Sequence, residues 1–208
     1  MNKADFNEFL QDAELNIETI GRNDKFSDDH HFPYEPTSYS VLERLAESGY
    51  ISQDDCLIDY GCGKGRVPFY MCHKVGCKAV GIEMMDEFWT LANDNLRKFE
   101  GAKKHAKLVG EISFVKSNAE EYEVPDDATC FFFFNPFSIE IMRKVLSKIL
   151  DSYYANPRRM RLFFYYPQDE YVAYFMTVDE MQFVDEIDCQ DLFEEKTKRN
   201  VVMVFEMM

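Results

Sequence analysis

Two spacings of apolar residues run along the chain and together predict an α/β protein. Short apolar runs are typical of strands buried in a sheet. The first five predicted strands are 56–60, 78–82, 112–116, 129–134 and 158–166. Between them, apolar residues recur every three or four positions, which predicts helices. The main predicted helices are 39–48, 66–75, 85–99 and 138–154, with a short one at 168–177. Strands that alternate with helices favour a doubly wound, mostly parallel sheet with helices on both faces.

The last part of the chain predicts a different connection. Residues 181–189 and 200–206 read as two strands, joined by the short polar segment 191–199. No crossover helix fits in that segment, so we expect an antiparallel pair. The run Thr129–Phe134 contains four consecutive phenylalanines, which indicates a strand covered on both faces at the centre of the sheet.

The N-terminal residues predict a helix followed by an irregular segment. From Asn2 to Ile20 apolar residues keep helical spacing, and Gly21 supplies a stop. The expected apolar face, which would pack on the sheet edge or act as a lid, is Phe6, Phe9, Leu10, Ala13, Ile17 and Ile20. Residues 22–36 have no periodicity and two prolines, and we predict that they are mobile. We therefore divide the chain into 1–36, an N-terminal helix and lid segment, and a main domain at 37–208.

The first predicted strand runs directly into a glycine-rich loop. The sequence CLIDY is followed by GCGKG, with Gly61, Gly63 and Gly65 at every second position. Glycines at the end of a buried strand indicate that a ligand presses against the main chain. The next strand ends in Glu83, 18 residues after Gly65, where a carboxylate can accept hydrogen bonds from ribose hydroxyls. The pair predicts a cofactor site.

The spacing of this loop distinguishes two kinds of cofactor. Dinucleotide-binding enzymes use G-x-G-x-x-G, whose third glycine would fall at position 66, where this chain has Arg66. Asp59 precedes the first glycine by two positions and offers an anionic acceptor. A carboxylate there suits a cofactor with a cationic amino group better than a pyrophosphate. A nicotinamide-dependent oxidoreductase is thus the less favoured alternative.

The pattern Asp59-x-Gly61-x-Gly63-x-Gly65, followed by a strand that ends in an acid, resembles class I S-adenosylmethionine-dependent methyltransferases. That resemblance implies a seven-stranded Rossmann-like sheet with order 3-2-1-4-5-7-6 and an antiparallel last hairpin. It also implies that Asp59, Gly61 and Gly63 hold the methionyl end of the cofactor, with the backbone of Cys62 facing it.

The same resemblance implies further contacts with S-adenosylmethionine and its product S-adenosylhomocysteine. Glu83 would bind ribose, and Asn118 with Ala119 would lie beside adenine, since an amide oxygen can accept from an exocyclic amine. The segment before the first strand often closes over the methionine end in this family. Tyr34 and Thr37 are therefore candidate cofactor contacts, with capping and packing as the alternative.

A second informative stretch follows the phenylalanine-rich strand. Asn135 appears abruptly after five apolar positions, and Pro136 disfavours helical geometry for it. Ligand chemistry in a doubly wound sheet occurs beyond the carboxyl ends of the strands. We predict that Asn135 is catalytic and accepts a hydrogen bond from an attacking amine. Pro136, Phe137 and Tyr165 would line the substrate site, with the rings of Tyr34, Phe137 and Tyr165 facing a cation.

The segment Asn135-Pro136-Phe137 resembles the N-P-P-F/Y motif of methyltransferases that act on planar amides and exocyclic amines, although the second proline of that motif is missing here. The segments YEPTS, GCKAVGIEMM and FNPF also resemble the seven-strand histone-lysine methyltransferases. This second likeness covers mainly residues 34–137. Both resemblances imply methyl transfer to nitrogen.

The composition and net charge limit the kinds of partner that the protein can bind. The net charge of −15 opposes a general affinity for nucleic acid or an anionic membrane, because phosphate binding depends on Lys and Arg. The basic segment 101–110, expected to be a solvated connector, is the one local patch to test. No apolar run approaches the roughly 20 residues that span a bilayer, and residues 1–21 are too acidic for a secretion signal. We therefore expect a cytoplasmic enzyme whose cysteines are reduced. We also expect no metal, because Cys72, His73 and Cys77 lack the second pair of ligands that a zinc site needs.

The sequence leaves the methyl acceptor and the oligomeric state open. A protein side chain or a small molecule is favoured as the acceptor. RNA or DNA is disfavoured by the charge but not excluded. A module that binds S-adenosylmethionine without catalysis is a further alternative.

Overall fold

The seven strands form one sheet with the predicted order. A computed structural model describes residues 3–22 and 34–208. Its sheet has the order β3-β2-β1-β4-β5-β7-β6. The strands are β1 (Cys56–Tyr60), β2 (Lys78–Glu83), β3 (Ile112–Lys116), β4 (Cys130–Phe134), β5 (Met160–Tyr165), β6 (Gln182–Asp188) and β7 (Val201–Met207). Strands β1 to β5 pair in parallel, whereas β7 pairs antiparallel with β5 and β6. The predicted fold class is confirmed.

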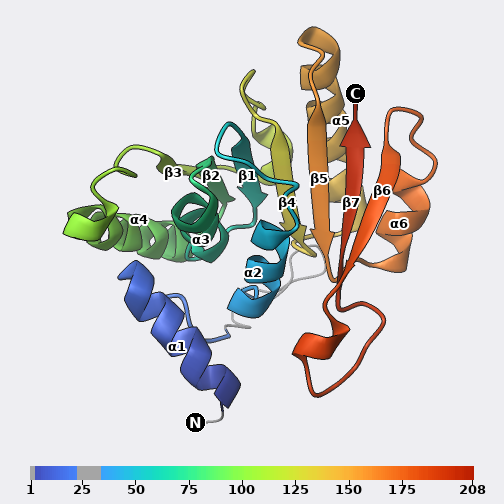
Figure 1. Ribbon diagram of the computed structural model, residues 1–208. Helices are drawn as coiled ribbons and strands as arrows, with labels where there is room; N and C mark the ends of the chain where they lie inside the picture. Colours follow the sequence, from blue (N-terminus) through green and yellow to red (C-terminus); the bar gives the residue numbers. More distant parts are fainter. Residues whose placement is uncertain (1–2, 23–33) are drawn as a thin grey trace.

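Helices cover both faces of this sheet (Figure 1). The α-helices in the described residues are α1 (Lys3–Leu15), α2 (Tyr39–Glu47), α3 (Arg66–Val75), α4 (Asp86–Gly101), α5 (Ile139–Ala155) and α6 (Asp169–Phe175). Three short 3-10 helices are η1 (Lys103–His105), η2 (Ala119–Glu121) and η3 (Gln190–Leu192). Helices α2, α3 and α4 pack on one face, and α5 and α6 pack on the other. Apart from α1, the predicted boundaries of helices and strands differ from these by no more than two residues.

Strand β4 shows why the core forms around the sheet. Its residues alternate between the two packed faces: Phe132 joins the layer under α2 and α3, whereas Phe131 and Phe133 join the layer under α5. All three rings are at most 1% exposed. Burial of each contributes about 1.5–3 kcal/mol relative to exposure. The phenylalanine run thus fixes β4 in the middle of the sheet and leaves its carboxyl end, Phe134 and Asn135, at the functional edge.

The prediction for α1 is wrong in two respects. The helix ends at Leu15 rather than Ile20, because Asn16 adopts a left-handed conformation with φ of 59°. The next residues are extended, and the backbone amides of Thr19 and Ile20 donate to the Asp12 carboxylate. Most of the expected apolar face also points away from the protein: Phe6, Phe9 and Leu10 are 48%, 55% and 46% exposed, whereas Ile17, beyond the end of the helix, is buried as expected. The side that faces the body of the protein carries the half-buried Glu8 and the buried Asp12.

The described residues contain neither a membrane-spanning helix nor a metal-binding cluster. No helix among them is long and apolar enough to cross a membrane. No group of three or more His, Cys, Asp or Glu residues in the described ranges has metal-binding geometry. The six cysteines are free and buried.

Candidate functional site

A cavity opens where β1, β2 and β4 end. It is bounded by the glycine loop after β1, the segment 34–37, the start of α4, the turn before η2 and the residues that follow β4. The lining residues that bear on function are Tyr34, Glu35, Thr37, Asp59, Gly61, Cys62, Gly63, Arg66, Glu83, Phe88, Ser117, Ala119, Glu120, Phe134, Asn135, Pro136, Phe137 and Ile141. Most sequence-predicted site residues therefore meet at one cavity.

The glycine loop is held in a shape that side chains would prevent. The amides of Gly61 and Cys62 donate to the Ile82 carbonyl at 3.0 Å each, which folds the loop back on β2. A Cβ atom on Gly61 would come within 2.8 Å of Pro136, and one on Gly63 would overlap the Tyr34 ring. Both glycines also have positive φ, 76° and 53°, which side chains rarely adopt. Main chain therefore forms this wall of the cavity.

Asp59 brings a buried carboxylate to the cavity. It precedes the last residue of β1 and is 3% exposed. Among the described residues, no group donates a hydrogen bond to its Oδ2 atom. Burial, and secondarily the nearby Glu83, raise the pKa of Asp59 well above its usual value. A carboxylate in this state fits a cationic ligand group, which would supply the missing partner.

Glu83 connects the second strand to the glycine loop. Its Oε2 atom accepts a hydrogen bond from the Gly63 amide at 2.9 Å, and its Oε1 atom accepts one from the Met85 amide at 2.8 Å. The residue is 6% exposed and lies at the cavity. These contacts hold the loop and the start of α4 in register around the same space.

Of the two residues expected beside adenine, Asn118 and Ala119, one lines the cavity and the other is exposed to solvent. Ala119 lines the cavity, together with Ser117. Asn118 does not: it is exposed, and its extended backbone conformation (φ −65°, ψ 144°) places it at the start of η2 with its carbonyl accepting from Glu121. The turn therefore presents the residues on either side of Asn118 to the cavity.

Tyr34 and Thr37 cover the glycine loop from the N-terminal side. The Tyr34 hydroxyl donates to the Thr19 carbonyl at 2.6 Å, and its ring packs on Phe88 with centroids 4.8 Å apart. Thr37 is 3% exposed, and its carbonyl accepts from Arg66. Most of the segment predicted to be mobile, residues 23–33, lies outside the described residues.

Arg66 is a cavity residue that the sequence interpretation did not assign. It is 3% exposed, yet its guanidinium reaches three separate segments. Nε donates to Thr19 Oγ1 at 2.7 Å, Nη1 donates to the Thr37 carbonyl at 3.0 Å, and Nη1 pairs with Glu8. The signal for it was its position: a cation stands directly after the last glycine, where a close-packed helix start would favour a small residue.

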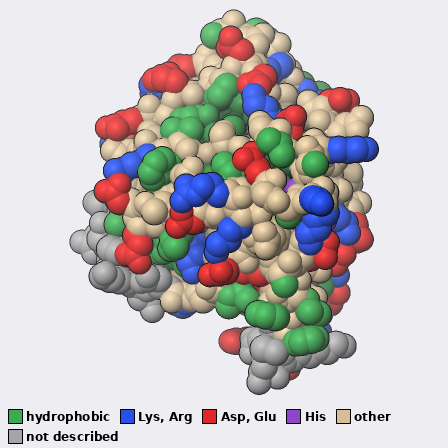
Figure 2. All heavy atoms as spheres, turned by 90° about the vertical axis from the view of Figure 1, so that its left-hand side faces the viewer, with side chains coloured by type: hydrophobic (Ala, Val, Ile, Leu, Met, Phe, Trp, Pro, Cys, Tyr) green, Lys and Arg blue, Asp and Glu red, His purple; other side chains and the backbone are tan. Residues whose placement is uncertain are grey.

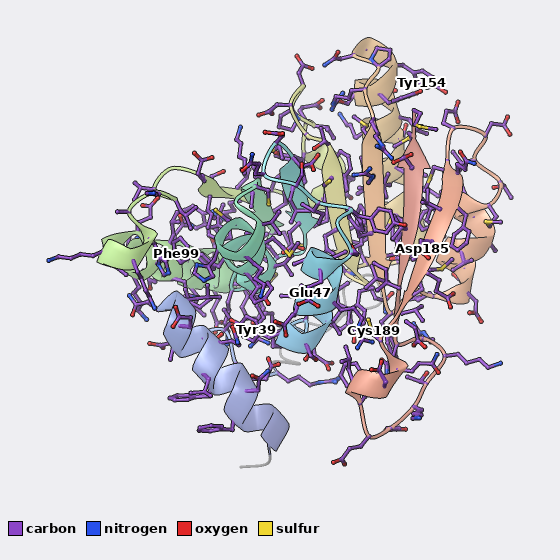
Figure 3. All side chains as sticks on the ribbon, viewed as in Figure 1. Tyr39, Glu47, Phe99, Tyr154, Asp185 and Cys189 are labelled. Carbon is purple, nitrogen blue, oxygen red and sulfur yellow. The ribbon has the colours of Figure 1, made fainter. Side chains whose placement is uncertain are left out.

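Tyr39 and Asp12 complete this charged group, which we call the Arg66 network: Arg66, Glu8, Asp12, Thr19 and Tyr39. The Tyr39 ring lies 4.3 Å below the guanidinium, and its hydroxyl donates to Asp12 at 2.5 Å. Figure 3 shows Tyr39 at the side of α2 that faces α1. Burial is the main cause of the raised pKa of Tyr39, so its hydroxyl keeps the proton that it donates. The network attaches α1 to the glycine loop.

The opposite end of the cavity is formed by the residues after β4. Asn135 has a φ of 44°, and its Oδ1 atom accepts a hydrogen bond from Gln168 Nε2 at 2.7 Å. Pro136 packs against Gly61, and the buried Phe137 lines the cavity while its carbonyl accepts from the Tyr171 hydroxyl. Gln168 also escaped the sequence interpretation, because nothing in its local pattern marks it as distinct from a helix-capping residue.

Tyr165 does not line the cavity. It is 5% exposed, and its ring packs on Phe134 with centroids 4.7 Å apart. The pattern of β5 correctly placed it at the functional edge, but strand alternation turns its side chain into the layer under α2. Tyr165 therefore packs behind Phe134, which lines the cavity, and does not reach the lining itself.

The predicted basic connector is only partly solvated. His105 is 1% exposed and stacks on Phe99 with centroids 3.9 Å apart, so its predicted surface position is wrong. Lys104 pairs with Glu14 at 3.3 Å on α1. On the face shown in Figure 2, Lys and Arg side chains are interspersed with Asp and Glu rather than gathered in one patch.

Comparison with known proteins identifies the family. Residues 21–153, more than half of the chain, match the family described as histone methylation protein DOT1. The chain belongs to the DOT1 family. A protein-lysine N-methyltransferase from Saccharolobus islandicus (strain REY15A) is 32% identical over 121 residues, which cover 58% of this chain and 71% of that protein. An H3 lysine-79-specific histone-lysine N-methyltransferase from Dictyostelium discoideum is 29% identical over 75 residues, 36% of this chain and 4% of that protein.

Solved structures extend this likeness to the fold of the DOT1-family chain. A glycopeptide N-methyltransferase in complex with S-adenosylmethionine has a TM-score of 0.61 at 8% identity, covering 81% of this chain and 86% of that one. An RNA methyltransferase from Salinibacter ruber in complex with S-adenosylhomocysteine has a TM-score of 0.52 at 18% identity, covering 83% and 94%. Family and fold agree: this DOT1-family chain is an S-adenosylmethionine-dependent methyltransferase of class I.

Proposed function

We propose that this protein transfers the methyl group of S-adenosylmethionine to the side-chain amine of a lysine in a basic protein. The observation that carries the proposal is a single cavity with two unlike ends. One end holds the buried carboxylate of Asp59, whose Oδ2 atom has no hydrogen-bond partner among the described residues, and the other holds the side-chain amide of Asn135. The 32% identical relative, a protein-lysine N-methyltransferase, supports the choice of acceptor.

At the cofactor end, Asp59 would accept from the ammonium of the methionyl group. The main chain of Gly61, Cys62 and Gly63 would pass alongside this group, since side chains there would collide with Pro136 and Tyr34. Glu83 would accept from ribose hydroxyls, and Ala119 would contact adenine. Asn118 points to solvent, so we assign it no contact.

The N-terminal part completes that end. Tyr34 and Thr37 line the cavity, and the Arg66 network attaches them to α1. For the division of the chain into 1–36 and a methyltransferase domain at 37–208, we therefore propose that the described residues of the first part, 3–22 and 34–36, border the cofactor end.

At the acceptor end, the Asn135 amide oxygen would accept a hydrogen bond from the attacking amine and orient its lone pair. Pro136 and Phe137 flank it, and Phe134 precedes it. Apolar and aromatic walls disfavour an ammonium ion and so favour the neutral amine, which is the nucleophilic form. The ring of Phe137 and, from the cofactor end, that of Tyr34 would face the sulfonium cation of the cofactor.

The bound cofactor supplies an electrophilic methyl group on a sulfonium. The protein residues position the acceptor and exclude water, which is where most of the rate enhancement arises in a one-step transfer. No covalent enzyme intermediate is needed.

Charge favours a basic polypeptide over a nucleic acid or a nucleosome. The net charge of −15 attracts cationic segments over long range and repels DNA and RNA phosphates. Free histones and other lysine-rich proteins therefore fit better than histones wrapped in DNA.

The test is methylation of purified core histones with methyl-labelled S-adenosylmethionine, in parallel with the same histones after lysine acetylation and with total RNA. We expect label in histones, recovery of methyllysine after acid hydrolysis, and no label in the acetylated sample. The Asn135→Ala variant is the control for contaminating activity.

Other outcomes would select the alternatives. Label in RNA that disappears with ribonuclease would replace lysine by a nucleic-acid acceptor. Binding of S-adenosylmethionine by calorimetry with no transfer to histones, to poly-L-lysine or to RNA would favour a non-catalytic binding module. A preference for NAD over S-adenosylmethionine in the same titration would overturn the proposed cofactor.

A further inference from the structure

We infer that Gln168 is a positioning residue for methyl transfer, which holds the Asn135 amide with its oxygen available to the acceptor. This inference deepens the proposed function and rests on it. Gln168 lies 33 positions after Asn135, in the loop between β5 and α6. Gln168 does not line the cavity, so any effect of Gln168 on methyl transfer would act through Asn135.

The two residues meet because neighbouring strands end side by side. Phe134 pairs with Tyr165 as the last residues of the parallel strands β4 and β5. The residue after each one, Asn135 and Tyr166, has a left-handed backbone, with φ of 44° and 52°. Side chains other than glycine adopt this conformation at a cost, so surrounding contacts must maintain it. Both chains therefore turn sharply at the same level of the sheet edge.

Contacts hold the Gln168 loop from two sides. The Gln168 carbonyl accepts from the amides of Tyr171 and Val172 at 3.0 and 3.2 Å, which anchors its backbone to the first turn of α6. Arg199, from the link between β6 and β7, donates to the carbonyls of Pro167 and Tyr166 at 3.0 and 3.3 Å. Its guanidinium also lies 4.4 Å from the centre of the Tyr166 ring.

Helix α6 reaches the acceptor segment a second time. The hydroxyl of the buried Tyr171 donates to the Phe137 carbonyl. The loop and helix after β5 therefore hold both Asn135 and Phe137, and a change in Gln168 leaves the Tyr171 contact in place. This separation allows the role of Gln168 to be tested without loss of the whole segment.

The chemistry of an amide explains why this bond matters. An asparagine side chain offers an oxygen with two acceptor sites and a nitrogen with two donors, and rotation by 180° exchanges them. The Gln168 NH₂ group occupies one oxygen site at 2.7 Å, which fixes the rotation and leaves the second site for an amine N–H. Without Gln168, the amide can present its NH₂ group to the acceptor, which repels the N–H bonds of an amine.

The test compares Gln168→Ala with Gln168→Glu, an isosteric change that replaces the donor by an acceptor. We expect kcat for histone methylation to fall about 10-fold to 100-fold in both, as for other losses of alignment. The Kd for S-adenosylmethionine should stay within about twofold, because Gln168 lies outside the cavity. Gln182→Glu, the same change at an exposed position on β6, should leave kcat unchanged.

A pH series distinguishes positioning from a structural role. Protonation turns the introduced carboxyl of Gln168→Glu into a donor, so its kcat relative to wild type should rise as pH falls. A ratio that is constant with pH, or equal loss of kcat and cofactor affinity, would overturn the inference. So would a Gln168→Glu variant with normal kcat, since it would mean that Asn135 presents its NH₂ group to position 168.

A second measurement does not depend on the acceptor. The side-chain amide signals of Asn135 in a ¹H–¹⁵N NMR spectrum can be assigned by their loss in Asn135→Ala. They should shift in Gln168→Ala and not in Gln182→Glu. If histones are not methylated but these signals shift, the acceptor is wrong and the contact stands; if the signals do not move, the inference about Gln168 fails whatever the acceptor.

Discussion

The two ends of the cavity use different kinds of interaction. Around the cofactor end, charged groups dominate: Asp59, Glu83 and the buried Arg66 lie within it, and Glu8 and Asp12 reach Arg66 from α1. At the acceptor end, the contacts of Asn135 and Phe137 are neutral hydrogen bonds from Gln168 and Tyr171. The same sheet edge thus supports an ionic site and a neutral one.

This difference matches the demands on each end. A cofactor with a permanent cation and an ammonium group can be held by a buried carboxylate whose desolvation it offsets. The lysine amine that we propose as the acceptor must be neutral when it attacks, and a carboxylate beside it would favour the protonated form instead. Mutations at the two ends should consequently separate binding from turnover.

The largest expected effect comes from the Arg66 network. Arg66→Met leaves the buried Asp12 and the half-buried Glu8 without their cation, and we expect the free energy of unfolding to fall by about 3–5 kcal/mol. Urea denaturation measures it. Arg97→Met removes an exposed pair with Asp94 and should cost about 0–1 kcal/mol. Equal effects of the two variants would mean that the network does not stabilise the attachment of α1.

Asp59 should come next and act on affinity. Asp59→Asn removes the carboxylate that would meet the cofactor ammonium, and we expect the Kd for S-adenosylmethionine to rise about 30-fold to 1,000-fold. Isothermal titration calorimetry measures the change, with the exposed Asp54→Asn as a matched control. A Kd within threefold of wild type would place the ammonium elsewhere.

The raised pKa of Asp59 gives both affinity and stability a pH dependence. The cofactor cation favours the ionised carboxylate, so affinity should increase with pH from the usual aspartate range up to the raised pKa. In the unliganded protein the sign is opposite: the fold favours the protonated form, so this stabilisation is complete at low pH and is lost as pH rises through the same window. Asp59→Asn should abolish both trends and raise the neutral-pH stability of the unliganded protein by about 1–2 kcal/mol. Calorimetric titration measures the affinity and thermal unfolding measures the stability, each over about pH 4 to 8. The same pH dependence in wild type and in Asp59→Asn would contradict this prediction.

The smallest expected effect is at Asn118. The sequence resemblance predicts a contact with adenine, but the side chain is exposed at the start of η2. We expect Asn118→Ala to change the Kd for S-adenosylmethionine by less than about twofold, as for most surface substitutions. A loss of tenfold or more in the same titration would show that the turn rearranges when the cofactor binds.

The local pattern of apolar residues predicted the strands well. A strand buried on both faces of a parallel sheet is a short apolar run, such as Cys56–Tyr60 or Thr129–Phe134. The glycine loop and Asn135 were also recognisable, since each interrupts an apolar strand at its carboxyl end. These features depend on residues close together in the chain. The strand order came from the family resemblance rather than from the pattern.

The failures depend on partners far apart in the chain. The orientation of α1 is set by Arg66, 58 positions from Glu8, and a buried guanidinium outweighs the preference of Phe6 and Phe9 for burial. Gln168 meets Asn135, 33 positions away in the chain, only because β4 and β5 end side by side. Tyr165 and Asn118 lie at the expected edge of the sheet, but neither lines the cavity. For Tyr165 the alternation of side chains along β5 decides the face, and for Asn118 the turn before η2 decides it.

The most direct test of the two-ended account is Asn135→Ala, measured by calorimetry for S-adenosylmethionine and by single-turnover methylation of core histones. The account predicts a Kd within about twofold of wild type and a turnover rate lower by about 100-fold or more, because the variant removes alignment and leaves the cofactor end intact. Parallel loss of binding and turnover, or no loss of turnover, would contradict it.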